Sequence, residues 1–198
     1  MENQKFTSSD GKESQVTMLS DKESFYVELK GGVGFLKNYK GGDFAFVGIL
    51  PPEGMSNADY LGSFTGQEFA TSVLNKKSDK DVYVKLPEFS YDYTSTLNPY
   101  LKNLGIQKAF LPEADFSGMV ERSQELGVKI DSVLHKTHIE LDRNGTKAAA
   151  VTAVMMAVNS VMPVEREKLE IYLERPFIYA IVDTKTGVPI FMGDVNKL

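Results

Sequence analysis

The sequence predicts an α+β fold built mostly from antiparallel strands, with a few short helices. Two observations support this prediction. Most apolar segments alternate with a period of two, which is typical of strands buried on one face. Gly and Pro residues separate these segments, as turns separate the strands of an antiparallel sheet. Helical spacing occurs in few places, so helices are a minority in the expected fold.

In the first half of the chain, three strands are expected: 24–30, 44–50 and 81–89. In the first of them, Phe25, Val27 and Leu29 alternate with Tyr26 and Glu28. The second is mostly apolar and is stopped by a pair of prolines. Helical spacing follows each of the last two strands, which predicts helical segments at 57–75 and 94–104.

The second half of the chain is expected to hold four strands: 129–145, 168–173, 177–183 and 189–195. The apolar residues of the first do not keep strict alternation, so we expect a bulge or the strand start near Asp131. The last two strands are separated by Lys185-Thr186-Gly187, which predicts a hairpin.

Composition limits the possible functions. The chain has 198 residues, enough for one sizeable core or two small domains. Its net charge of −5 and its lack of a Lys/Arg cluster argue against binding to nucleic acid. Because there is no Cys, disulfides, thiolate metal sites and cysteine nucleophiles are excluded. No segment has the pattern of an export signal or a membrane span, so we expect a soluble chain without membrane contact.

No pattern of catalytic residues is found in the sequence. It contains no nucleophile elbow, no P-loop and no paired-histidine zinc motif, so we expect neither an enzyme nor a cofactor nor a metal site. The two histidines, His135 and His138, stand three residues apart in one expected strand and point to opposite faces. We expect His135 to be a buried structural histidine. The carboxylates Asp81, Glu88 and Asp115 are scattered at turns and strand ends.

One tract, "NGTKAAAVTAVMMAVNS" at 144–160, is unusual because it has no charge from Ala148 to Val158. It is shorter than the about 20 apolar residues that cross a membrane. Its Ala and Met favour helix, whereas its Val and Thr favour strand. Asn144-Gly145-Thr146 at its start matches the N-glycosylation pattern, but a flexible turn is the favoured interpretation.

Three separated segments together resemble the serpin family of protease inhibitors, of the bacterial type. "VYVKLPEFSYDYTSTLNPYLKNLGIQKAF" with "ADFSGM" is similar to the central region of the family. "VLHKTHIELDRNGTKAAAVTAV" resembles the hinge of its reactive loop, and "RPFIYAIVDTKTGVPIFMGDV" resembles its C-terminal signature. The segments stand in family order. The resemblance implies the β-rich C-terminal half of a serpin fold, as one domain over 1–198 with a reactive loop at about 143–168.

This resemblance implies an inhibitor that acts as bait for a serine or cysteine endopeptidase. The protease cleaves the exposed loop and is held as an acyl-enzyme while the cut loop inserts into a sheet as a new strand. The implied scissile bond joins Asn159 to Ser160, within the window of Val158, Asn159 and Ser160. The implied structural residues are His135 and the run Arg175, Pro176 and Phe177. The implied hinge residues are Gly145, Thr146, Lys147, Ala148, Ala149, Ala150, Val151 and Thr152.

The tract has the properties that insertion requires. With a period of two, Thr146, Ala148 and Ala150 would face the core, whereas Lys147 and Ala149 would face outward. The only charge of the tract therefore falls on the outward face, where it is not buried without a partner. Asn at the specificity position suits an asparagine-specific cysteine protease, and cleavage within 156–158 would suit an elastase-like enzyme.

The chain departs from the family in several respects. Arg143 stands where the family usually has an acidic residue, and the segment 160–175 is several residues longer than usual. A complete serpin is about twice this length, and the half not seen here carries most of the central sheet. Two functions follow: an inhibitor, alone or together with the missing N-terminal half, or a non-inhibitory remnant that cannot insert its loop. An extracellular or periplasmic location is expected from the family alone.

Overall fold

The computed structural model describes residues 2–143, 145–146 and 166–198. The chain divides into two compact units, the first made of 1–89 with 140–198 and the second of 90–139. In the described part of the chain, the first unit contains a five-stranded and a four-stranded sheet. No described helix is both long enough and apolar enough to cross a membrane.

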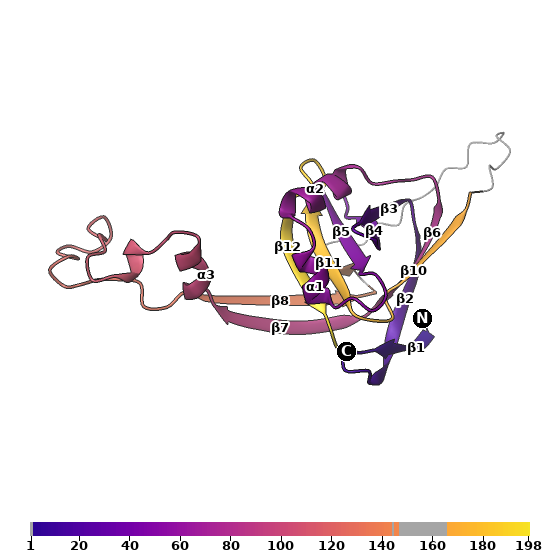
Figure 1. Ribbon diagram of the computed structural model, residues 1–198, viewed down its shortest axis with the longest axis horizontal. Helices are drawn as coiled ribbons and strands as arrows, with labels where there is room; N and C mark the ends of the chain where they lie inside the picture. Colours follow the sequence, from indigo (N-terminus) through magenta and orange to yellow (C-terminus); the bar gives the residue numbers. More distant parts are fainter. Residues whose placement is uncertain (1, 144, 147–165) are drawn as a thin grey trace. The chain divides into compact units, whose positions relative to one another are not determined.

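The five-stranded sheet is antiparallel throughout. Its strands, in spatial order, are β12 (Pro189–Val195), β11 (Phe177–Asp183), β5 (Phe44–Leu50), β4 (Gly32–Asn38) and β3 (Phe25–Leu29). Figure 1 shows β11 between β12 and β5. The predicted strands at 44–50, 177–183 and 189–195 and the final hairpin are therefore confirmed. β4 was not predicted, because its glycines were taken for turns. Gly34 is instead required by packing, since a Cβ there would overlap the backbone of Gly48.

Two helices, α1 (Asn57–Gly62) and α2 (Gly66–Leu74), cover one face of this sheet. Their side chains Tyr60, Phe69 and Val73 are fully buried against the apolar residues of the strands. The predicted helical structure over 57–75 is confirmed, but the region forms two helices instead of one. The second begins at its own N-cap, Thr65, which forms a capping box with Glu68.

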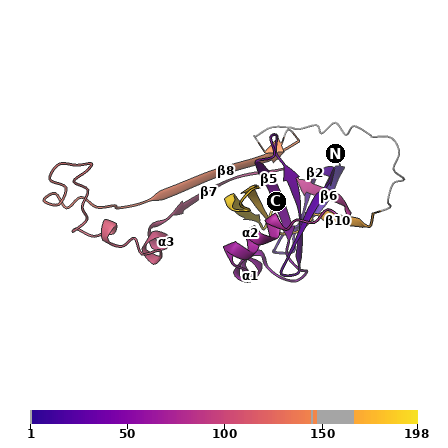
Figure 2. The ribbon, with the colours of Figure 1, turned by 90° about the horizontal axis from the view of Figure 1, so that it is seen from above.

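The four-stranded sheet contains β1 (Glu2–Thr7), β2 (Glu13–Glu23), β6 (Asp81–Pro87) and β10 (Lys168–Tyr172), in that spatial order. β1, β2 and β6 pair antiparallel, whereas β10 runs parallel to β6. Figure 2 shows β2, β6 and β10 side by side. β1 and β2 were not predicted, because polar and charged residues interrupt their apolar positions.

Aromatic rings join the two sheets of the first unit. The ring of Phe177 on β11 meets the rings of Phe6 on β1 and Phe89 edge-on, with centroids 6.4 and 5.9 Å away. Tyr179 stacks on Phe46 at 6.2 Å and contacts Phe89 at 5.5 Å. Such pairs each contribute about 0.5–1.5 kcal/mol beyond the area they bury. This row of rings therefore packs on the face of the five-stranded sheet opposite the two helices.

The second unit contains most of β7 (Phe89–Thr96) and β8 (Leu134–Asp142), together with α3 (Asn98–Asn103) and a 3₁₀ turn at Lys108–Phe110. β7 and β8 form a sheet with β9 (Gly145–Thr146), in the order β7-β8-β9. The predicted helix at 94–104 starts too early, because 94–96 extend β7.

Asn98, at the first position of α3, binds the turn before β8. Its side chain accepts from the N–H of Val133 at 2.8 Å and donates to the carbonyl of Asp131 at 2.7 Å. β8 begins just after this turn, at Leu134. A strand start near Asp131 is therefore confirmed, whereas the prediction that the strand begins at 129 is wrong.

Candidate functional site

The upstream root of the predicted reactive loop is the short strand β9. Gly145 pairs antiparallel with Asp142, and Thr146 with Leu141, so the chain turns back along β8. The turn favoured at 144–146 stays a prediction, since 145–146 form β9 and residue 144 lies outside the described residues. The remaining hinge residues, Lys147 to Thr152, and the predicted scissile bond from Val158 to Ser160 lie outside the described residues.

Arg143 lies just before this root. Its backbone N–H donates to a carboxylate oxygen of Glu88 at 3.1 Å. Glu88 follows β6, and its own N–H donates to the carbonyl of Thr17 on β2. Glu88 therefore supplies a carboxylate at the upstream root. The sequence itself has a basic residue, Arg143, where the family usually has an acidic one.

The downstream root is held by the segment that precedes β6. The N–H of Asp81 donates to the carbonyl of Glu167 at 2.9 Å, and Lys80 forms an ion pair with Glu167 at 3.0 Å. Arg166 donates from its guanidinium to the carbonyl of Ser78 at 3.1 Å. From Lys168 onward the chain is β10, in parallel register with β6. The hydrophobic pattern of the sequence did not predict that residues 78–80 contact the downstream root.

Arg175, Pro176 and Phe177 connect β10 to β11. Arg175 donates from Nη2 to the carbonyl of Pro51 at 2.6 Å, which ties this connection to the end of β5. Burial lowers the pKa of the Arg175 guanidinium, and the charge of Glu53 opposes that effect. Phe177 is fully buried between the sheets. The structural role predicted for this run is consistent with these contacts.

His135 differs from the prediction. It was expected to be buried, but it lies exposed on β8 within the second unit. The expected burial is therefore wrong in this chain, because β8 buries only Ile139 and Leu141, at its far end. His138 is also exposed, and its Nδ1 lies 2.9 Å from Oδ1 of Asp92. The odd spacing of three positions leaves the two imidazoles on opposite sides of the strand.

The scattered carboxylates do not meet in the structure. Asp81 forms an ion pair with Lys22 at 3.0 Å, and Asp115 accepts the N–H of Ser117 at 2.9 Å. Among the described residues, no three His, Asp or Glu side chains gather as they would around a metal ion.

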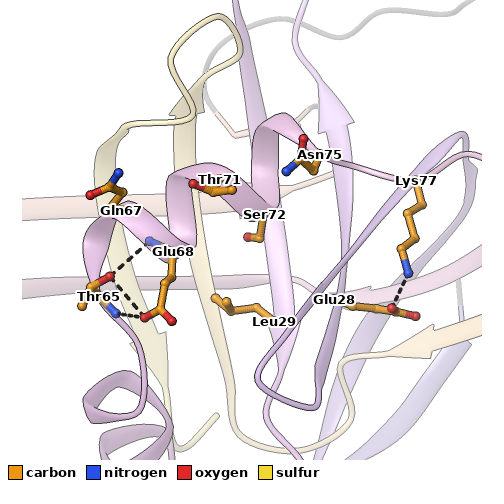
Figure 3. Close-up of a pocket in the computed structure, with 9 residues that line it drawn as sticks. All are labelled: Glu28, Leu29, Thr65, Gln67, Glu68, Thr71, Ser72, Asn75 and Lys77. Atoms are coloured by element: carbon orange, nitrogen blue, oxygen red, sulfur yellow. Dashed lines mark hydrogen bonds and ion pairs between the residues drawn. The ribbon is translucent and has the colours of Figure 1, made fainter.

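A groove of about 550 Å³ lies between α2 and β3 in the first unit. Figure 3 shows Thr71, Ser72 and Asn75 along its helical wall and Leu29 opposite them. At one end, Lys77 forms an ion pair with Glu28 at 2.5 Å. The lining thus offers hydroxyl, amide and paired charged groups. No described lining residue is a histidine or a cysteine.

The comparisons with known proteins agree on one family. The family model described as "Serpin (serine protease inhibitor)" matches residues 1–198. Iripin-8 of Ixodes ricinus is 35% identical over 81% of this chain and 39% of its own length. Serpin-Z1C of Triticum aestivum is 32% identical over 94% of this chain and 48% of its own.

Among solved structures, the native state of the thermophilic serpin tengpin matches with a TM-score of 0.81 and 38% identity. That match covers 100% of this chain and 50% of tengpin. The chain therefore spans about half the length, or less, of these relatives. The predicted fold, the β-rich C-terminal half of a serpin, agrees with this match. With a family model that matches its whole length, the chain belongs to the serpin family.

Proposed function

We propose that the chain carries the reactive loop of a suicide-substrate inhibitor of serine or cysteine endopeptidases. The protease would cleave within Val158, Asn159 and Ser160 and be held as an acyl-enzyme while the upstream part of the loop inserts as a strand. The expected site of action is extracellular or periplasmic, in keeping with the family.

The observation that best supports this proposal is the separation of the two loop roots between different sheets. The upstream root, Gly145–Thr146, pairs with β8 in the sheet β7-β8-β9. The downstream root leads into β10, in the four-stranded sheet. A cut between two such roots leaves each cut end attached to its own sheet. The upstream part is then free to move without carrying β10 with it.

The upstream part also has the composition that a new strand needs. Only Lys147 is charged among the hinge residues 145–152, and small side chains dominate at the positions expected to face the core. A buried, unpaired charge costs several kcal/mol in general, so a charge on the core-facing side would oppose insertion.

A second candidate function is a non-inhibitory member that is cleaved but cannot insert its loop. The part of each relative that the chain matches is 50% of tengpin and 48% of the wheat serpin. For the inhibitor, the preceding half of the fold, as a separate or joined polypeptide, would be the partner that completes the sheet. The whole domain over 1–198 would then act as one part of that assembly.

A protease assay separates the candidates. The chain is incubated with elastase-like, trypsin-like and asparagine-specific proteases, with and without the preceding half of tengpin as the added polypeptide. An inhibitor gives a complex that survives boiling in denaturant and has the mass of protease plus cleaved chain. Cleavage in the loop without any complex, under both conditions, would exclude inhibition. Mass spectrometry of the released peptide identifies the scissile bond.

A further inference from the structure

The segment from Lys77 to Asp81, here called the 77–81 segment, connects α2 to β6 and is bound on both of its sides. On the side of β3, the backbone of Lys77 exchanges two hydrogen bonds with the backbone of Tyr26, at 2.8 and 3.0 Å. The hydroxyl of Tyr26 donates to Oδ1 of Asp79 at 2.8 Å. Tyr26 belongs to β3 and is 2% exposed, so its ring is held at a buried position of the five-stranded sheet.

On its other side, the 77–81 segment binds the downstream root of the loop. The contacts are the hydrogen bond from Asp81 to Glu167, the ion pair of Lys80 with Glu167, and the hydrogen bond from Arg166 to Ser78. On the side of the 77–81 segment, these contacts use the carbonyl of Ser78, the side chain of Lys80 and the N–H of Asp81. The segment is therefore a bridge between β3 and the residues that immediately follow the undescribed part of the loop.

The two roots are held differently. Among the described residues, β9 has two residue pairs with β8. The downstream root has the five pairs of β10 with β6 and, in addition, the three contacts with the 77–81 segment. Local opening of the downstream root must therefore break the pairs with β6 and the contacts with the 77–81 segment together.

We propose that the 77–81 segment positions the downstream root of the reactive loop, and that Tyr26 and Asp79 are its positioning residues. Through them the root is tied to the core of the five-stranded sheet. When the loop is cut, β10 stays in place and only the upstream end is released. The role of this segment in inhibition rests on the proposed function. Its contacts with the downstream root can be tested without any protease.

The same contacts shift the pKa values of the groups involved. Burial, together with the hydrogen bond to Asp79, raises the pKa of Tyr26 to about 12. The hydroxyl of Tyr26 in turn holds the pKa of Asp79 below its usual value. The ion pair with Glu167 raises the pKa of Lys80. Hydrogen bonds to a charged acceptor are stronger than neutral ones, so the Tyr26–Asp79 bond is the one to remove first.

The test is hydrogen–deuterium exchange of the intact chain and of Tyr26→Phe, Asp79→Asn and the double variant. The net value of one hydrogen bond corresponds to about a fivefold change in exchange, and to about tenfold or more for a charged acceptor. We expect such a rise at the amides of Asp81 and of 168–172, with no change at Gly145 and Thr146. The double variant should equal the single ones, because both changes remove the same bond.

Tyr60→Phe is the matched control. It removes a buried tyrosine hydroxyl that donates to the carbonyl of Leu29, away from the 77–81 segment. The proposal is overturned if this control raises exchange at 168–172, relative to the other slowly exchanging amides of the first unit, as much as Tyr26→Phe does. It is also overturned if the Tyr26 and Asp79 variants raise exchange uniformly over the first unit. Asp79 is exposed, so its variant tests the tie even if Tyr26→Phe destabilises the core. Failure of inhibition in the protease assay would leave these exchange results unaffected.

Discussion

Lys30, in the turn between β3 and β4, forms an ion pair with Glu68 of α2 across 2.6 Å. The same carboxylate accepts the backbone N–H of Thr65 at 2.8 Å and completes the capping box of α2. Glu68 therefore connects a strand turn to the start of the helix that covers the sheet. The pKa of Glu68 is lowered to about 2, first by the hydrogen bond from Lys30 and then by that from Thr65.

The stabilising effect of Glu68 should be lost in acid. A carboxylate whose pKa is lower in the folded than in the unfolded chain stabilises the fold above pH 4.5, and this effect fades as the pH falls toward 2. We expect the difference in free energy of unfolding between the wild type and Glu68→Gln to shrink over this range. Urea denaturation at several pH values measures it.

Lys30→Met serves as the companion variant to Glu68→Gln. It should reproduce most of the loss at pH 7, because the bond from Lys30 is the largest cause of the lowered pKa. A difference between wild type and Glu68→Gln that stays constant from pH 6 to pH 2 would contradict this account.

Tyr60→Phe should lower the free energy of unfolding by about 1 kcal/mol, the usual net value of one hydrogen bond. The Tyr60 hydroxyl is fully buried and donates to the carbonyl of Leu29 at 2.6 Å. Tyr100→Phe removes an exposed hydroxyl and is the control, expected to stay within about 0.5 kcal/mol of wild type. Thermal or urea denaturation compares the two, and equal stabilities would be evidence against the importance of the Leu29 bond.

Gly187→Ala should destabilise the first unit by at least about 1–3 kcal/mol, the cost of a residue held in a rarely adopted backbone conformation. Gly187 has a φ of +72°, and a Cβ there would also overlap the backbone of Ala70 on α2. Gly62→Ala is the matched control, since a Cβ at Gly62 meets nothing within 4 Å. We expect that variant to be as stable as wild type or more so. A melting temperature for Gly187→Ala equal to that of Gly62→Ala would refute this explanation.

Thr146→Arg, made in a complete inhibitor that contains this chain, should convert the inhibitor into a substrate. In the alternating pattern Thr146 faces the core after insertion, and a buried unpaired charge opposes insertion while leaving cleavage intact. Ala149→Arg places the same charge on the outward face and should still inhibit. The number of inhibitor molecules consumed per protease molecule inhibited measures both. Full inhibition by Thr146→Arg would rule out insertion as the mechanism.

Much of the fold could be predicted because local patterns are strong where burial is one-sided or complete. Phe44–Leu50 and Phe177–Asp183 are apolar runs bounded by turn residues, and both were found with their correct ends. By contrast, β2 and β4 were missed. β2 has polar residues over most of its length, and the glycines of β4 serve close packing against β5 rather than turns.

The candidate site was predicted in outline, from motifs that identify the loop and its flanks. The environment of each residue could not be predicted in the same way. His135 is exposed because burial depends on which elements cover β8, and no local pattern contains that information. The same holds for Glu88, which meets the N–H of Arg143 from a distant part of the chain.

The sequence by itself determined the family, the order of most strands and the uncharged tract between 148 and 158, because each depends on residues that are close together along the chain. Only the tertiary structure decided which sheet each loop root joins and which residues hold it. Tyr26, Asp79 and Glu167 come together from three separated segments, through one hydrogen bond and the 77–81 segment. Contacts of this kind follow from how the sheets pack, which is a property of the folded chain as a whole.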